Sequence, residues 1–248
     1  MSVEIKRPSL WLHLTEFFRA LRERREADSF LKTHQSSKQV KGYPVLIIPG
    51  FMASHVSTGP LRKLLDRLGY HAIDWGLGRN YARLEEIDVL SDMIEKIYSE
   101  HDQKLTIIGW SLGGIYARRL ATLHADKTRR VITLGSPYRH LKSPNYANWL
   151  YQLFQKIRSK ERREEPQWVE ELKLPIPVPS VAIYSKTDGI VPWQACMDEE
   201  DQTDHQNIEV VGSHIGLGMN QNVIAHVLAV LEADDQLFAS SANNASIR

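Results

Sequence analysis

Short apolar runs alternate with amphipathic segments along most of the chain. The runs, some with the turn that follows, span residues 43–51, 70–75, 105–108, 130–137, 180–184 and 208–211. Their length and their content of Val, Ile and Leu are typical of buried strands. Between them, apolar residues recur every three or four positions, which is typical of helices that pack by one face. This alternation predicts an α/β fold, with a mostly parallel sheet of about six strands and helices on both faces.

Residues 1–41 depart from this pattern, because they hold one amphipathic helix and a polar linker. The apolar positions of the helix lie at helical spacing, and they are Leu10, Leu14, Phe17, Phe18 and Leu21. Its basic positions are Arg19, Arg22, Arg24 and Arg25. Two interpretations stay open. The helix packs on the rest of the protein or on a second subunit, or it lies at a membrane surface with Trp11 and the phenylalanines opposite the arginines.

A long connection separates the runs at 130–137 and 180–184. It has about forty residues, far more than an ordinary connection to the next strand. It predicts a helical cap insertion over residues 138–178, inside an α/β domain that spans residues 42–236. The broad apolar face of this insertion consists of Tyr146, Trp149, Leu150, Leu153, Phe154 and Ile157. We expect this face to line a pocket or to rest on an interface, and the alternative is that it packs on the domain. Small and polar residues predict a disordered tail over 237–248.

Composition narrows the classes of protein that fit this pattern. The 248 residues are 42% hydrophobic and 25% charged, which is ordinary for a soluble globular protein. The formal net charge is +1, so no overall positive field indicates binding to nucleic acid. The single cysteine, Cys196, excludes a disulfide within the chain. Because no secretion signal, bilayer-spanning run or cluster of metal ligands is readable, we expect a cytoplasmic protein without a metal or cofactor.

The strongest chemical signal is the turn that joins the run at 105–108 to the next helix. It reads Gly109-Trp110-Ser111-Leu112-Gly113-Gly114, with a serine between two glycines. Such a turn holds its serine at strained backbone angles, and the glycines make room for it. The helix that follows begins with unpaired N–H groups, which stabilise negative charge. A chain of this length contains Gly-x-Ser-x-Gly by chance roughly one time in ten. The alternative is therefore a serine without a catalytic role, and the presence of a base and an acid elsewhere in the chain distinguishes the two.

A serine nucleophile needs a base, and the base needs an acid that orients it. Asp188 directly follows the fifth apolar run, and His214 directly follows the sixth. Because the carboxyl ends of parallel strands lie at one edge of a sheet, we expect both side chains near Ser111. The alternatives are a surface-turn aspartate and a loop-capping histidine. His205 precedes its strand and should lie at the opposite edge, and the acidic residues within 198–204 resemble a solvent-exposed run.

Two backbone N–H groups would complete such a site by binding the oxyanion of a reaction intermediate. One belongs to Leu112, directly after the serine, and the other to Phe51, in the turn after the first apolar run. The loop that holds Asn80 should border the same site, although Asn80 fits a plain turn equally well. The candidates for substrate binding are Trp110, Trp149, Leu153 and Phe154.

Three motifs together resemble those of the α/β-hydrolase superfamily, of the serine esterase and lipase type. They span residues 109–114, 188–192 and 212–217, and the resemblance covers roughly residues 43–231. The chain departs from that family at Pro49, where its lipases often have histidine, and no antiparallel strands are readable before residue 43. The resemblance implies an α/β-hydrolase fold with a reduced sheet and a helical cap. It also implies hydrolysis of carboxylic esters with hydrophobic acyl groups, by a Ser111-Asp188-His214 triad.

The resemblance leaves other functions open. An acyltransferase or a thioesterase uses the same triad, and differs in the acceptor or in the bond that is cleaved. A non-catalytic, membrane-associated partner protein could retain the fold. The partners expected from the sequence are therefore a small-molecule or lipid ester, and a membrane surface for the N-terminal helix; the oligomeric state is open.

Overall fold

The parallel sheet that the sequence predicts is present. The computed structural model describes residues 5–33, 42–140, 167–198 and 204–245. Within these residues, six strands pair in the order β2-β1-β3-β4-β5-β6, and every pairing is parallel. The strands are β1 (Pro44–Ile48), β2 (His71–Asp74), β3 (Leu105–Trp110), β4 (Thr128–Leu134), β5 (Ser180–Ser185) and β6 (His205–Val210). All carboxyl ends therefore lie along one edge of the sheet, where ligands bind in open α/β sheets.

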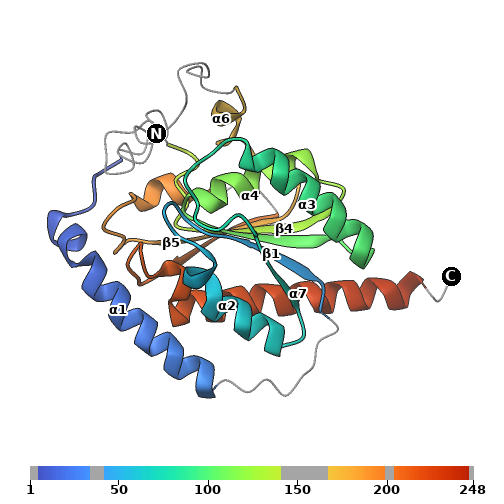
Figure 1. Cartoon of the computed structure of the whole chain (residues 1–248), viewed down its shortest axis with the longest axis horizontal. Coiled ribbons are helices and arrows are strands. Elements are labelled where there is room, and N and C mark those ends of the chain that lie inside the picture. The colour runs from blue at the N-terminus through green and yellow to red at the C-terminus, as the bar shows by residue number, and fades with distance from the viewer. Residues whose placement is uncertain (1–4, 34–41, 141–166, 199–203, 246–248) are drawn as a thin grey trace.

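Helices cover both faces of this sheet. They are α1 (Leu10–Thr33), α2 (His55–Arg67), α3 (Glu86–His101), α4 (Leu112–Leu123), α6 (Trp168–Glu171) and α7 (Gln221–Ala245), with short segments η2 (Trp193–Cys196) and η3 (Leu217–Met219). α1, α2 and α7 lie on one face, and α3 and α4 lie on the other (Figure 1). Val45 and Ile47 pack toward the first group, whereas Leu46 and Ile48 pack toward the second. Because β1, β3 and β5 are buried at every residue, their apolar side chains occupy both faces and do not alternate with exposed polar ones, whereas the edge strands β2 and β6 are polar and partly exposed.

α2 begins at His55 and contains Pro60, although proline is favoured at the first position of a helix. Ser54 sets this start, since its side chain accepts a hydrogen bond from the Val56 N–H at 3.4 Å. α7 continues to Ala245, past residue 237, and the disordered tail expected over 237–248 stays a prediction.

Most of the expected cap lies outside the described residues. These are residues 141–166, and they include Trp149, Leu153 and Phe154. Residues 167–178 are described, and they contain the short helix α6 and lead into β5. The cap and its apolar face stay predictions.

α1 contacts the domain by a side that carries two glutamates together with Ala20, Ala27 and Leu31. Six large apolar residues of its first half point outward instead, with exposed fractions from 41% for Leu21 to 72% for Phe18. The two glutamates, Glu16 and Glu23, are buried. Their carboxylates accept hydrogen bonds from backbone N–H groups of the domain, so this side of the helix faces inward. Of the helices in the described ranges, none carries an apolar stretch of the length that crossing a membrane requires.

Candidate active site

Ser111 stands at the tight turn between β3 and α4. Its backbone has φ 53° and ψ −117°, a conformation that costs a non-glycine residue about 1–3 kcal/mol. The surrounding backbones approach closely. A Cβ on Gly109 would collide with the Gly113 carbonyl, and a Cβ on Gly113 would collide with the Ile48 carbonyl. The Ser111 N–H donates to Leu134 O at 2.8 Å, which ties the strained residue to β4. Both glycines of the motif are thus required by close packing of the backbone.

Ser111, His214 and Asp188 form one hydrogen-bonded chain. His214 Nε2 lies 2.9 Å from Ser111 Oγ, and His214 Nδ1 lies 2.6 Å from Asp188 Oδ2. All three side chains are buried. A proton on Nδ1 would be donated to the carboxylate, which leaves Nε2 to accept the serine proton. The structure therefore brings together the three residues that the sequence predicts to meet, at distances suited to proton transfer.

Strand topology explains why these three residues meet. Ser111 follows β3, Asp188 follows β5 and His214 follows β6, so their loops leave the same edge of the sheet. β4 lies between β3 and β5, and its last residue is followed by Gly135 at φ 57°. A Cβ on Gly135 would lie 3.4 Å from His214 Nδ1 and still closer to Leu217. The loop after β4 thus leaves room for the imidazole and the carboxylate.

Buried carboxylates influence the charge of His214. Burial disfavours the charged imidazole, but attraction to Asp188 and, to a lesser extent, to Glu16 outweighs this effect and raises the pKa of His214. Asp188 is itself held in place, since its Oδ1 accepts hydrogen bonds from the N–H groups of Ile190 at 2.8 Å and Val191 at 2.7 Å. The site favours the imidazolium–carboxylate pair that forms when histidine takes a serine proton.

The loop after β1 lies beside Ser111. A Cβ on Gly50 would lie 3.2 Å from Ser111 Cβ, and Phe51 is the next residue in this loop. Leu112 begins α4, and the N–H groups of a first helical turn have no acceptor within their own helix. The two segments expected to donate to an oxyanion are therefore adjacent to the serine.

Asn80 holds this loop in place, a role that sequence reasoning missed. Its side chain is fully buried and donates from Nδ2 to Pro49 O at 2.8 Å. Its backbone carbonyl accepts from Met52 N–H at 2.8 Å, and its backbone N–H donates to Ala53 O at 2.9 Å. Asn80 thus gives side-chain support to the loop after β1 at Pro49, the position where this chain departs from the lipases that have histidine. The only signal in the sequence was its place after the second apolar run.

Trp110 packs inside the domain next to the His214 loop. Its exposed fraction is 7%, and its Nε1–H donates to His214 O at 3.1 Å. The ring also lies against Gly218 and Gly50, because a Cβ on either glycine would come within 3.3 Å of it. These contacts fix the backbone that carries His214. Contact between Trp110 and a substrate stays a prediction.

A second missed contribution comes from α1. Glu16 and Glu23 accept hydrogen bonds from backbone N–H groups in the loops that carry Asp188 and His214. A signal was present in the sequence. The two glutamates are seven residues apart, which places them on one side of a helix and away from its apolar residues.

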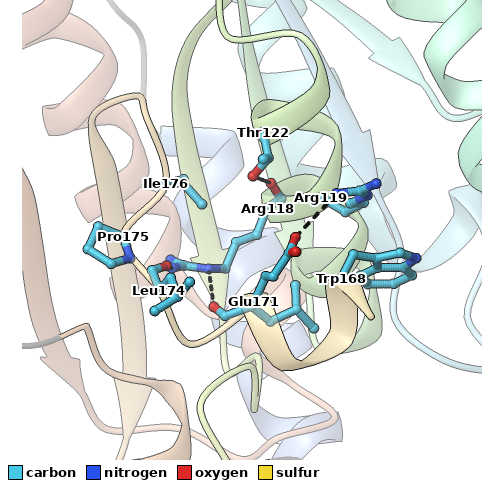
Figure 2. A pocket seen from close by; sticks show the side chains of 9 residues that line it. Arg118, Arg119, Thr122, Trp168, Glu171, Leu174, Pro175 and Ile176 are labelled. Atoms are coloured by element: carbon cyan, nitrogen blue, oxygen red, sulfur yellow. Dashed lines mark hydrogen bonds and ion pairs between the residues drawn. The ribbon is translucent and has the colours of Figure 1, made fainter. Parts of the chain in front are cut away.

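A pocket of about 200 Å³ lies between α4 and the segment around α6 (Figure 2). Two arginines line it, and both are paired. Arg118 lies 2.9 Å from Asp198, and Arg119 lies 3.8 Å from Glu171. Asp198 is buried in this pair, so the prediction of a solvent-exposed acidic run is wrong at that residue. The lining of this pocket includes no member of the Ser111-His214-Asp188 chain. We therefore assign the candidate site to the edge at Ser111.

Metal ligands are not gathered in the part of the chain that the structure describes. In that part, no group of three or more His, Cys, Asp or Glu side chains is arranged to hold a metal ion. His205, the histidine expected at the opposite edge, begins β6 and lies 3.3 Å from Asp198. It does not contact the Ser111 chain.

Comparison with known proteins places the chain among hydrolases. Its residues 45–220 match the model of the alpha/beta hydrolase family. Among solved structures, a monoacylglycerol lipase from Paleococcus ferrophilus is 18% identical with a TM-score of 0.57, over 78% of this chain and 94% of that one. A pyrethroid hydrolase from Sphingobium faniae JZ-2 is 16% identical with a TM-score of 0.55, over 77% and 98%.

A thioesterase domain from the curacin biosynthetic pathway is 17% identical with a TM-score of 0.51, over 77% of this chain and 91% of that one. At such identities the likeness extends to the fold alone. A search among curated protein sequences finds no match.

Proposed function

Because this chain belongs to the alpha/beta hydrolase family, we propose that it is a serine hydrolase that cleaves carboxylic esters with a hydrophobic acyl group. One observation carries this proposal. Ser111, His214 and Asp188 are linked by contacts of 2.9 and 2.6 Å, in a buried site at the carboxyl edge of the sheet. Such a chain activates a serine hydroxyl as a nucleophile, and a serine without a chemical role needs no buried histidine and carboxylate.

The proposed reaction begins when His214 Nε2 takes the proton of Ser111 Oγ. The oxygen attacks the ester carbonyl carbon, and the tetrahedral oxyanion is stabilised by the N–H groups of Leu112 and Phe51. The C–O bond to the alcohol breaks as the imidazolium returns its proton to the leaving oxygen. This leaves an acyl group on Ser111. A water molecule, deprotonated by His214, then attacks the acyl carbon. The bond from this carbon to Ser111 Oγ breaks as the imidazolium returns the proton to Oγ, and the carboxylic acid leaves. Asp188 stabilises the imidazolium in both halves.

The preference for a hydrophobic acyl group rests on the sequence of the expected cap. The spacing of Trp149, Leu153 and Phe154, which lie outside the described residues, predicts one apolar helix face, and we assign the binding of the hydrocarbon chain to it. Hydrolysis rates over a series of p-nitrophenyl esters test it. Octanoyl esters should be cleaved with a higher kcat/KM than acetyl esters, and a strict preference for acetyl esters contradicts this part of the proposal.

A fluorophosphonate probe and a p-nitrophenyl ester test the catalytic part. The wild-type protein should react with both, whereas Ser111→Ala should be unlabelled and hydrolyse the ester at near-background rate. Ser99→Ala is the matched control, because Ser99 is an exposed serine on α3, and it should behave as the wild type. Undiminished turnover by Ser111→Ala would sink the proposal.

An acyltransferase or thioesterase function rests on the same residues, and the products distinguish it. A hydrolase releases the free acid when alcohol is added, whereas an acyltransferase transfers the acyl group to the alcohol. An acyl-thioester cleaved much faster than the matching ester would assign the protein to the thioesterases.

A further inference from the structure

The inner side of α1 contacts the loops that carry the acid and the base. Glu16 is the centre of these contacts. Its Oε1 accepts hydrogen bonds from the N–H groups of Gly189 at 2.7 Å and His214 at 3.1 Å, and its Oε2 accepts one from Ile215 at 3.0 Å. Gly189 directly follows Asp188. One buried carboxylate therefore bridges the loop after β5 and the loop after β6. The relative position of these two loops determines whether Asp188 contacts His214.

Other residues on the same side of α1 reinforce this bridge. Arg19 donates to Glu16 Oε1 at 2.7 Å and to Thr187 O at 2.7 Å, so it orients the carboxylate and grips the β5 loop. Glu23 accepts from the Ser213 N–H at 2.8 Å and from its hydroxyl at 3.0 Å. The backbone of α1 also abuts the β5 loop, because a Cβ on Gly189 would come within 2.7 Å of His13 N.

We propose that Glu16 is a positioning residue of the active site, whose carboxylate holds the Asp188 and His214 loops together. The catalytic part of this statement rests on the proposed function. The Glu16 carboxylate accepts three hydrogen bonds from backbone N–H groups of two loops. Packing of the helix does not require them, since α1 also contacts the domain through the buried residues Ala20 and Ala27. The attraction of Glu16 also contributes to the raised pKa of His214.

The charged and titratable groups around this bridge all bear on the test. They are Asp188 in the β5 loop, Cys196 in η2 beside it, and His13, Arg19 and Glu23 on α1. Asp188 contacts the imidazole directly and stays in place in every variant below, so a change seen on altering Glu16 is not a change of the acid itself.

Glu16→Gln removes the charge and keeps one acceptor oxygen, and Glu16→Asp keeps the charge and shortens the reach. Glu26→Gln is the matched control, because Glu26 is exposed on the same helix. With a p-nitrophenyl ester, we expect kcat to fall on the order of 10- to 100-fold in Glu16→Gln and Glu16→Asp, with KM little changed, since misplaced reacting groups slow the chemical step. The acid limb of the kcat/KM profile should shift to lower pH in Glu16→Gln alone.

NMR titration of the His214 ring provides a readout without a substrate. The pKa of His214 should fall in Glu16→Gln and stay near the wild-type value in Glu26→Gln, whether or not esters are cleaved. If the wild-type protein does not cleave esters, the proposed ester-hydrolase function is refuted, and the titration alone then decides the role of Glu16. If the pKa of His214 and kcat in Glu16→Gln both equal the wild-type values, the proposal is overturned. Should Glu16→Gln not fold, a wild-type kcat in folded Glu16→Asp overturns it instead.

The outer side of α1 carries a different and independent feature. Six large apolar residues face solvent there, with exposed fractions between 41% and 72%, and they are Leu10, Trp11, Leu14, Phe17, Phe18 and Leu21. They lie at helical spacing in the first half of the helix. The basic residues Arg22, Arg24 and Arg25 are exposed in the second half, whereas Glu16 and Glu23 are buried against the domain. Arg22, Arg24, Arg25 and Lys32 outnumber the exposed acidic residues Glu26 and Asp28, so the exposed surface of α1 is apolar with a net positive charge.

From this charge we infer that the outer side of α1 binds an anionic lipid surface. Anionic headgroups would pair with the arginines while the apolar residues enter the interface. A second copy of the chain fits less well, because paired α1 helices would bring their own arginines close together. The first residues of α1 lie against the β5 loop, so a bound membrane would lie near the edge of the sheet that holds Ser111.

Cosedimentation with vesicles tests this surface. Vesicles of phosphatidylglycerol and phosphatidylcholine should bind the wild-type protein at least tenfold more tightly than phosphatidylcholine alone. The double variant Phe17→Ser/Phe18→Ser should lose this binding, and Val89→Ser, which alters an exposed valine on α3, should retain it. Absence of wild-type binding to anionic vesicles overturns the inference. A dimer in sedimentation velocity that Phe17→Ser/Phe18→Ser abolishes assigns the surface to a second copy and overturns it as well.

Discussion

Replacing Asn80 with alanine should slow the proposed reaction without altering Ser111, His214 or Asp188. The buried Asn80 side chain donates to Pro49 O at 2.8 Å and accepts from the Ala82 N–H at 3.0 Å. Asn80→Ala leaves both backbone groups without these partners, at about 1–3 kcal/mol each. Because Met52 in the same loop is 48% exposed, water reaches part of the loop. We therefore expect the lower part of the summed range, a loss of about 2–3 kcal/mol in the free energy of unfolding.

The effect on catalysis follows from the position of the Phe51 N–H. Loss of an oxyanion donor costs about 100- to 1,000-fold in kcat. In Asn80→Ala the donor is displaced and not removed, because the backbone hydrogen bonds from Met52 N–H and to Ala53 O persist. We expect kcat to fall on the order of 10- to 100-fold, with KM little changed.

Steady-state kinetics on a p-nitrophenyl ester and urea unfolding check both numbers. Asn222→Ala is the control, since this asparagine is exposed at the start of α7, and it should match the wild type in both assays. Asn80→Asp keeps the acceptor for Ala82 but places a carboxylate against the Pro49 carbonyl, so it should be at least as slow as Asn80→Ala. A folded Asn80→Ala protein with wild-type kcat refutes the idea that Asn80 positions the loop after β1, which carries the Phe51 N–H.

Two further predictions follow from the site and its turn. The kcat/KM for ester hydrolysis should rise with pH as His214 loses its proton. Because the pKa of His214 is raised, the midpoint of this rise should lie above the usual histidine value of about 6.5. A midpoint below that value contradicts the charges described around His214. Gly109→Ala should lower the free energy of unfolding by about 3 kcal/mol, since its Cβ collides with the Gly113 backbone. Gly59→Ala, at a helical position where a Cβ meets no atom beyond its chain neighbours, should change that energy by less than about 1 kcal/mol in the same urea experiment, because the ring of Pro60 offsets the helix propensity gained. Equal effects at the two glycines speak against the packing described for the turn.

The Ser111 chain was predictable because each of its members is defined by local sequence. A serine between glycines marks a strand–helix turn, and Asp188 and His214 each follow an apolar run. Parallel pairing places the carboxyl ends of all strands at one edge, so three local signals become one site. No knowledge of side-chain packing was needed for that step.

Residues that act on distant backbone groups were not predictable in this way. Asn80 supports the loop at Pro49, 31 positions earlier, and Glu16 reaches the N–H of His214, 198 positions later. A backbone N–H or carbonyl has no sequence signature, so nothing in the chain identifies the partner of either side chain. Asp198 was assigned wrongly for a similar reason, because Arg118 on α4, its ion-pair partner, is 80 positions away.

The sequence by itself therefore determined the sheet, the order of its elements and the identity of Ser111, Asp188 and His214. Hydrophobic periodicity and turn chemistry are local, and they are sufficient for these features. Only the tertiary structure decided which side of α1 faces the domain. Apolar burial alone would turn Leu14, Phe17 and Phe18 inward, but unpaired backbone N–H groups around Asp188 and His214 bind the Glu16 and Glu23 carboxylates instead. Buried polar groups require partners, and these partners exist only once the chain is folded.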